Sequence, residues 1–411
     1  MGRHCLTLLA VLPILLLSGC SSRATAPPTA IDGAPPAARV ERCLDRAVTM
    51  TSFLQTFPWA LKQWQANKQL VGELQPALVG RAALVWGWED GMVRSLSSLS
   101  RRAAQVHQQA PDAVLQGCIF EFVSRAVEGV SVPEDVQLAF GLEPVSRNYD
   151  YDAMLPSQAP PHTYQGWGID AAVPDITRSE TQLWFFHLAT IYLDAGLEAI
   201  HLGNIARITA HDPDLQATEN LLLRIRAYAA THARRGWVIL DAHTHGLVRG
   251  DRLLLDFHSA PLRPREVGDP ELEDVVLEEG FLNGIYGRSR GGTTPGGDRV
   301  HSQRFLVELD NGYAGNVDSG CDRPECVWGR DEITWFAQQP YDRRNELLRR
   351  FWARVPELDP VGRFQVPAIR PLQSLLITGC DQYLLHRPED LGCGAGQLDT
   401  VIEMWGPPPG P

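Results

Sequence analysis

The chain almost lacks lysine. Lys62 and Lys68 are the only two lysines in 411 residues, whereas Lys and Arg together number 37. We interpret this bias toward Arg as genomic base composition. It also has a chemical consequence, because after residue 68 no side chain can form a Schiff base or supply a bridging lysine ligand to metal ions.

Positive charge is scarce overall. The formal net charge is −12 at pH 7, and hydrophobic residues make up 44% of the chain. An acidic chain of this kind is a poor ligand for the phosphate backbone, so we expect no nucleic-acid partner. The hydrophobic content is ample for a core, and the length allows one large domain or two small ones.

The first apolar run, Leu6 to Leu17, is too short for a membrane-spanning helix. Arg3 and His4 precede it and small residues follow it, which is typical of a secretory signal. Leu17-Ser-Gly-Cys20 resembles the lipobox of bacterial lipoproteins. The resemblance implies removal of a signal peptide at 1–19 and lipidation of Cys20. An ordinary signal peptide with a chance Cys is the alternative.

These features predict a location in the bacterial cell envelope, outside the cytoplasm, on a membrane that the sequence does not identify. Residues 20–38 are rich in Pro, Ala and Ser, a composition that favours a tether over a packed core. We expect a single domain over 39–405 and a disordered tail over 406–411, where Pro and Gly dominate.

Eight cysteines are present. Once Cys5 and Cys20 are set aside, an even number remains, which favours disulfides in an oxidising compartment. The predicted pairs are Cys321–Cys326, Cys380–Cys393 and Cys43–Cys118. A zinc site is the alternative, but Cys321 and Cys326 have no close His or Cys partner in the sequence.

Helix and strand patterns alternate along the chain. Helices are expected over about 181–195 and 218–235, each followed by a strand, at 197–202 and 237–240. Further strands are expected over 82–86, 113–120, 171–174, 304–309, 333–337 and 364–368. About eight βα units in this length predict an α/β fold, a (β/α)8 TIM-like barrel with long βα loops. An open doubly wound sheet is the alternative, but no Gly-rich nucleotide turn supports it.

Acidic or amide side chains follow strand after strand. In a barrel the carboxyl ends of the strands converge on one cleft. Glycoside hydrolysis needs two carboxyl groups beside such a cleft, one as acid and the other as nucleophile or base. The catalytic candidates are Asp175, Asp241, Glu308 and Asp310. The candidates for substrate binding are Glu121, His201, Asn204, His243, Trp88, Trp167 and Trp335.

The architecture and the strand-end chemistry together resemble barrel glycoside hydrolases, although no diagnostic motif is matched. This resemblance implies a polysaccharide or glycan substrate and no cofactor. We therefore expect a lipid-anchored, glycoside-hydrolase-like protein, with a non-catalytic glycan-binding lipoprotein as one alternative.

A second alternative comes from Asp241-Ala-His243-Thr-His245-Gly246, which follows a predicted strand. This run is similar to the Asp-x-His-x-His-Gly strand end of amidohydrolases, whose two His bind a metal that activates water. Two imidazoles two residues apart on a strand point the same way. The resemblance implies a metal-dependent hydrolase with His243 and His245 as ligands of a divalent metal such as zinc.

Overall fold

The structure of the protein, a computed structural model, describes residues 30–56, 63–157, 169–311, 324–372, 382–390 and 394–407. Predictions on the signal peptide, on Cys20, on Trp167 and on most of the tail lie outside these residues. No helix in the described part of the chain is both long and apolar enough to cross a membrane.

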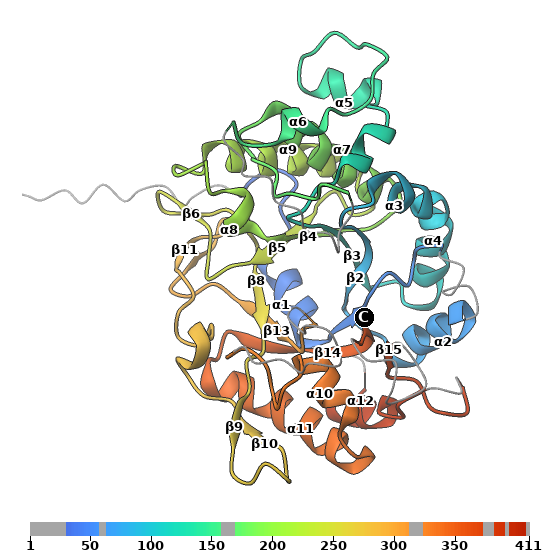
Figure 1. Ribbon diagram of the computed structural model, residues 1–411, viewed down its shortest axis with the longest axis vertical. Coiled ribbons are helices and arrows are strands. Elements are labelled where there is room, and N and C mark those ends of the chain that lie inside the picture. The colour runs from blue at the N-terminus through green and yellow to red at the C-terminus, as the bar shows by residue number, and fades with distance from the viewer. Residues whose placement is uncertain are drawn as a thin grey trace, which may run out of the picture.

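Eight parallel strands form a closed barrel (Figure 1). They are β1 (Ala47–Met50), β2 (Leu78–Val85), β3 (Val114–Ile119), β4 (Ala199–Asn204), β5 (Ile239–His243), β8 (His258–Pro261), β13 (Phe305–Glu308) and β14 (Gly362–Pro371). The first strand pairs with the last, Val48 opposite Val366, which closes the ring. The fold is thus a (β/α)8 barrel, as the sequence predicts.

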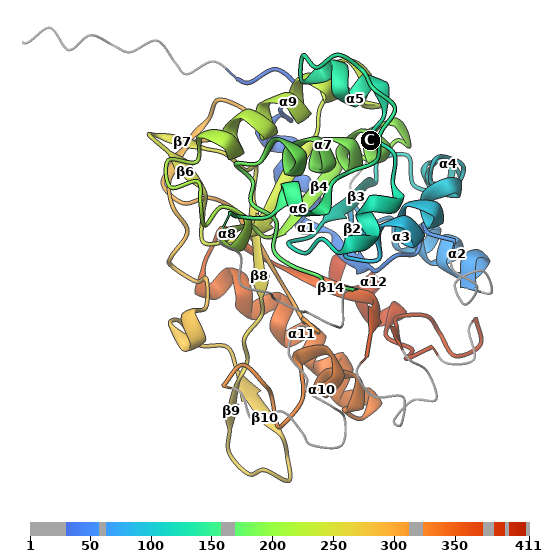
Figure 2. The same ribbon diagram turned by 45° about the horizontal axis from the view of Figure 1, so that its top comes forward.

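The helices surround the barrel (Figures 1 and 2). They are α1 (Ala37–Asp45), α2 (Trp64–Leu74), α3 (Glu89–Ser95), α4 (Leu99–Gln109), α5 (Glu134–Ala139), α6 (Tyr151–Met154), α7 (Ser179–Asp194), α8 (Ile205–Ile208), α9 (Gln216–His232), α10 (Glu332–Gln338), α11 (Tyr341–Leu358) and α12 (Leu398–Trp405). The interface of α7 with β3 depends on Gly117, because a Cβ there would lie 2.4 Å from the Tyr192 ring.

Short strands decorate the long βα loops. They are β6 (Val248–Arg249), β7 (Arg252–Leu253), β9 (Arg265–Val267), β10 (Asp274–Val276), β11 (Gly292–Thr293), β12 (Arg299–Val300) and β15 (Gln382–Leu384). The hairpin of β9 and β10 projects from the body of the molecule (Figure 2). These insertions confirm that several βα connections are long.

Helix α1 covers the amino end of the barrel. Its buried side chains Val40, Cys43 and Leu44 form one hydrophobic cluster with the first residues of several strands, among them Leu78 and Val114. Burying these apolar faces against each other stabilises closure at this end. The amino end is therefore closed by apolar packing, which leaves the carboxyl ends of the strands for a site.

Two of the strands predicted from the sequence are wrong. The run 333–337 is helix α10, because a short apolar run does not distinguish strand from buried helix and the Asp331 side chain caps the helix by accepting a bond from the Thr334 backbone. Residues 171–174 form only an isolated bridge, between Ala172 and Val123. The strands β1 and β8, each of four residues, are not predicted from the sequence.

The predicted Cys43–Cys118 disulfide is also wrong, because both thiols are free and buried. Cys43 belongs to the hydrophobic cluster at the amino end of the barrel, which includes Val114 at the start of β3, whereas Cys118 lies four residues further along that strand. At about 3.3 Å per residue Cys118 is about 13 Å beyond the start of β3, whereas the Cα atoms of a disulfide lie within about 7 Å of each other. Cys326 is disulfide-bonded. Cys321, Cys380 and Cys393 lie outside the described residues, so their pairings stay predictions.

Candidate functional site at the carboxyl end of the barrel

The barrel brings together three of the four predicted catalytic carboxylates. Asp241 belongs to β5, Glu308 ends β13, and Asp310 follows Glu308 by two residues. All three are buried. Asp175 stands apart from them: its carboxylate accepts bonds from the backbone and hydroxyl of Thr177 and lies 4.0 Å from His211. The Asp175 side chain therefore stabilises the loop that precedes α7.

Glu308 is the centre of the site. Arg81 donates to its Oε1, and Thr49 donates to its Oε2 over 3.0 Å. The Nη1 atom of Arg370 lies 3.5 Å from the same Oε2. Although burial alone would raise its pKa, the charges of Arg81 and Arg370 hold the pKa of Glu308 well below its usual range. Glu308 is thus an ionised carboxylate at neutral pH.

Asp310 shares these arginines. Its Oδ1 accepts from Arg370 Nη2 over 3.0 Å and lies 3.8 Å from Arg81 Nη2. The two guanidinium groups also lower the pKa of Asp310. Its backbone N–H donates to Glu332 over 2.9 Å, which ties the loop after β13 to α10. Both carboxylates therefore carry charge that two cations compensate.

Arg81 and Arg370 are not among the site residues predicted from the sequence. Arg81 lies within the apolar strand β2 and Arg370 within β14. Arg81 has a left-handed backbone, φ 56°, at a register irregularity between β2 and β3. Such a bulge redirects a side chain, and here the Arg81 side chain reaches Glu308. An Arg inside an otherwise apolar strand is the signal that could have found both residues, because a buried cation needs a partner.

Asp241 organises a second polar group in the barrel. Gln116 donates to its Oδ1 over 2.7 Å, and Ser259 donates to its Oδ2 over 3.1 Å. His201 Nδ1 lies 2.8 Å from the same Oδ2. Burial lowers the pKa of His201, so the imidazole is neutral and its Nδ1–H donates to Asp241. Asp241 therefore orients His201.

His243 lies between the cluster around Asp241 and the cluster around Glu308. Its ring lies edge-on to the His201 ring, with the centroids 4.8 Å apart. Its Nε2 is 3.7 Å from Glu308 Oε1, and its side chain is 20% exposed against 5% for Glu308. Among the described residues, no hydrogen-bond partner lies within reach of His243 Nε2 or His201 Nε2. His243 is thus a partly exposed side chain whose buried Nε2 atom faces Glu308.

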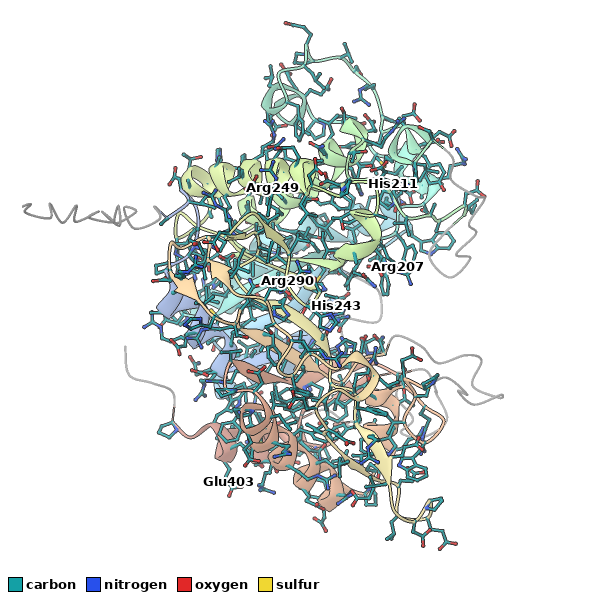
Figure 3. The ribbon with its side chains drawn as sticks, turned by 90° about the vertical axis from the view of Figure 1, so that its left-hand side faces the viewer. Arg207, His211, His243, Arg249, Arg290 and Glu403 are labelled. Carbon is teal, nitrogen blue, oxygen red and sulfur yellow. The ribbon has the colours of Figure 1, made fainter. Side chains whose placement is uncertain are left out.

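A cavity of about 300 Å³ opens beside His243. Asn204, Ser259, Arg263 and His245 contribute to its lining, together with apolar residues of the loop 282–285. Figure 3 shows His243, Arg207 and Arg290 on one face of the molecule. The predicted substrate residues Asn204 and His243 therefore meet at one pocket.

The other residues predicted to bind substrate, namely Trp335, Trp88 and Glu121, lie in different environments. Trp335 is fully buried in α10, so no ring face is open to a sugar and this prediction is wrong. Trp88, at the end of the β2 loop, is 51% exposed. Its backbone is left-handed, φ 49°, and its N–H donates to Ser124. Glu121 accepts from the backbone of Asn204 over 3.2 Å, so it positions Asn204.

The structure offers little for a metal. Within the described residues, no group of three or more His, Cys, Asp or Glu side chains is arranged to hold a metal ion. His243 and His245 both line the pocket, but His243 faces Glu308, which two arginines already engage. The donors present therefore do not fit the ligand set of a zinc hydrolase.

Solved structures resemble this chain at low sequence identity. No family model and no curated protein matches it. Its structure is similar to the native form of the Nostoc punctiforme debranching enzyme, with a TM-score of 0.33, 12% identity and coverage of 53% of this chain and 51% of that one. For the acarbose-soaked form the TM-score is 0.31 and the identity 11%, with 53% of each chain covered. The chain spans about half the length of these structures, and at such values the likeness assigns no activity to it.

Proposed function

We propose that this protein is a hydrolase of glycans, held outside the cytoplasm by a lipid on Cys20. The observation that carries the proposal is the 3.7 Å approach of His243 Nε2 to an arginine-bound, ionised Glu308, beside a pocket at the carboxyl end of a (β/α)8 barrel. In such barrels this end carries the chemistry.

The two side chains suit the cleavage of a glycosidic bond. The imidazolium form of His243 gives its Nε2 proton to the glycosidic oxygen as the bond to the anomeric carbon breaks. The carboxylate of Glu308 stabilises the positive charge that develops on the sugar ring. Water then attacks the anomeric carbon and returns a proton to His243. Asp241 orients His201 behind this pair, and Trp88 presents an exposed ring to a neighbouring sugar.

One observation favours a second function, a glycan-binding protein without catalysis. Both Glu308 and Asp310 are bound by arginines and have lowered pKa values, so neither carboxyl group holds a proton for a leaving oxygen. If His243 does not carry the proton, the site binds sugar without cleaving it. Asn204 and the pocket would serve both functions.

The test is the release of reducing ends from a panel of cell-wall and storage glycans by the purified full-length protein. The hydrolase predicts turnover on at least one glycan and a loss of at least about 10³-fold in kcat for Glu308→Gln. The control is Glu403→Gln, because Glu403 is an exposed residue of α12 paired with Arg349. Turnover that persists in Glu308→Gln contradicts the assignment, and glycan binding without any turnover establishes the second function.

A further inference from the structure

A second pocket lies at the amino end of the barrel, beside the start of α1. Its cavity measures about 220 Å³, which is room for about seven water molecules. Two of its lining residues come just before barrel strands, because Asp256 precedes β8 and Gln303 precedes β13. None of its lining residues lines the pocket beside His243. This second pocket, the amino-end pocket, is therefore separate from the site at the carboxyl end.

Gln303 brings a buried hydrogen-bond acceptor to the amino-end pocket. Its side-chain Nε2 donates to the Leu255 carbonyl over 2.5 Å, which fixes the orientation of the amide. The residue is 1% exposed, and among the described residues nothing donates to its Oε1. Buried amide oxygens in folded proteins nearly always accept a hydrogen bond. Gln303 Oε1 therefore requires a donor that the described part of the chain does not supply.

The charges around the amino-end pocket leave one carboxylate unmatched. Asp256 pairs with Arg226 over 2.9 Å, and Arg304 pairs with Glu41 over 3.0 Å, so these four charges cancel. Asp298 also lines the pocket and is exposed. Within the described part of the chain, no cation pairs with the Asp298 carboxylate. One negative charge is therefore in excess at this pocket.

Apolar side chains form much of the remaining wall of the amino-end pocket. Pro35, Ala37, Val40 and Val300 line it, and Val40 is only 5% exposed. A hydrocarbon group placed against these residues would leave water, which is favourable. The pocket thus combines an apolar wall with a hydrogen-bond acceptor and a negative charge.

We propose that the amino-end pocket binds a small primary amine in its ammonium form. The ammonium group donates to Gln303 Oε1, Asp298 compensates its positive charge, and the alkyl part packs against Val40 and Val300. An ammonium has three donors and no acceptor, so it matches a wall with an unfilled acceptor and an excess negative charge. The inference is independent of the proposed glycan function, because the two pockets share no lining residue.

The experiment compares three probes of the same chain length by NMR titration of the full-length protein at pH 7. The probes are n-butylamine, which is a cation at this pH, 1-butanol, which is neutral, and n-butyltrimethylammonium, a cation without N–H donors. We expect n-butylamine to bind at least about 10-fold more tightly than either of the others, because only it supplies both the charge and the donors. Its affinity should fall as salt is added.

Two variants assign the effect to the pocket. Gln303→Met removes the acceptor, and we expect it to weaken the binding of n-butylamine by at least about 10-fold. Asp298→Asn removes the excess charge at an exposed position, and we expect a loss of about 2- to 5-fold. Asp342→Asn is the matched control, because Asp342 is exposed on α11 and lies outside the pocket lining. Thermal unfolding identifies a variant that does not fold, and Asp298→Asn keeps the test valid if Gln303→Met does not.

Each of the other outcomes overturns the inference. If 1-butanol binds as tightly as n-butylamine, the pocket does not select a cation. Equal binding of n-butyltrimethylammonium shows that N–H donors are not recognised. If n-butylamine does not bind, or if its affinity in Asp298→Asn equals that of Asp342→Asn, the amino-end pocket is not the amine site. None of these results bears on the glycan function, which the glycan panel tests by itself.

Discussion

Each end of the barrel buries an ion-paired group, and the two groups differ in how completely their polar atoms are hydrogen-bonded. At the amino end Arg226 and Asp256 are 1% and 2% exposed and lie 2.9 Å apart. Arg226 also donates to the Val238 carbonyl, and Asp256 accepts from the Leu240 backbone. Helix α1 covers this end with apolar side chains. Both members of this pair are therefore hydrogen-bonded to each other and to the backbone.

At the carboxyl end, some buried polar atoms of the described residues have no hydrogen-bond partner. Among the described residues, Nε and Nη1 of Arg370 and Nε2 of both His201 and His243 have no hydrogen-bond partner. Leaving such groups unpaired costs free energy, about 1–3 kcal/mol each when fully buried. The comparison of these two groups teaches that the Arg226–Asp256 pair serves stability, whereas the group around Arg370 and His243 keeps hydrogen-bond donors for a ligand.

The largest effect is expected when the Arg226–Asp256 ion pair at the amino end is broken. Asp256→Ala leaves the Arg226 cation buried and unpaired, so we expect the free energy of unfolding to fall by about 3–5 kcal/mol. Turnover per folded molecule should not change, because the pair lies away from the pocket beside His243. Chemical denaturation and kcat measure the two quantities. The control is Glu357→Ala in the exposed pair with Arg354, where about 0.5 kcal/mol or less is expected. A loss of kcat in folded Asp256→Ala would contradict the division between the two ends.

At the carboxyl end of the barrel, a substitution should affect turnover and leave stability nearly unchanged. His243→Gln removes the proton carrier, and we expect kcat to fall by about 10²-fold or more. The side chain is partly exposed, so the free energy of unfolding should change by no more than about 0.5 kcal/mol. Assay and denaturation of the same preparation test both statements. An unchanged kcat would leave His243 as a binding residue only.

The pH dependence of stability should also differ between the ends. The arginines lower the pKa of Glu308, so its stabilising contribution is present above the ordinary carboxyl pKa and is lost as pH falls through the folded value. Burial raises the pKa of Asp256, so its contribution has the opposite sign and is lost as pH rises through its folded pKa. Denaturation between pH 3 and about 6 should therefore give a shallower acid loss for Glu308→Gln than for the parent. A parallel curve would show that Glu308 is not the residue that gains from ionisation.

The smallest effect concerns Trp88. Its left-handed backbone is costly for a residue with a Cβ, so Trp88→Gly should raise the free energy of unfolding by up to about 1 kcal/mol. The same change removes the exposed ring, so affinity for an oligosaccharide should fall severalfold. Gln75→Gly is the matched control, since Gln75 is also left-handed, φ 46°, but follows α2. Equal affinities for Trp88→Gly and the parent would exclude Trp88 from the binding surface.

Much of the fold could be predicted from the sequence. Six of the eight barrel strands were expected from apolar runs with polar ends, including β4 and β5 between their helices. The two missed strands, β1 and β8, are four residues long, too short to give a periodic signal. The run 333–337 within helix α10 is short, mostly apolar and buried, so its pattern predicts a strand where the structure has a helix.

Less of the site could be predicted. Asp241, Glu308 and Asp310 were chosen because they follow strands, and the structure brings them to one end of the barrel. Asp175 was chosen by the same rule and lies elsewhere, because the run before it is not a strand. Trp335 was assigned to a sugar because Trp is often exposed at such sites, but α10 turns its ring into the core.

The sequence by itself determined the alternation of apolar strands and helices, and with it the barrel and the polar residues at its carboxyl end. Only the tertiary structure decided what those residues meet. Arg81 and Glu308 are 227 positions apart, and they touch because ring closure brings β1 and β2 beside β14 and β13 while a left-handed residue in β2 turns its side chain toward the carboxylate. No local pattern encodes such a contact, because strand register and a single backbone irregularity set it.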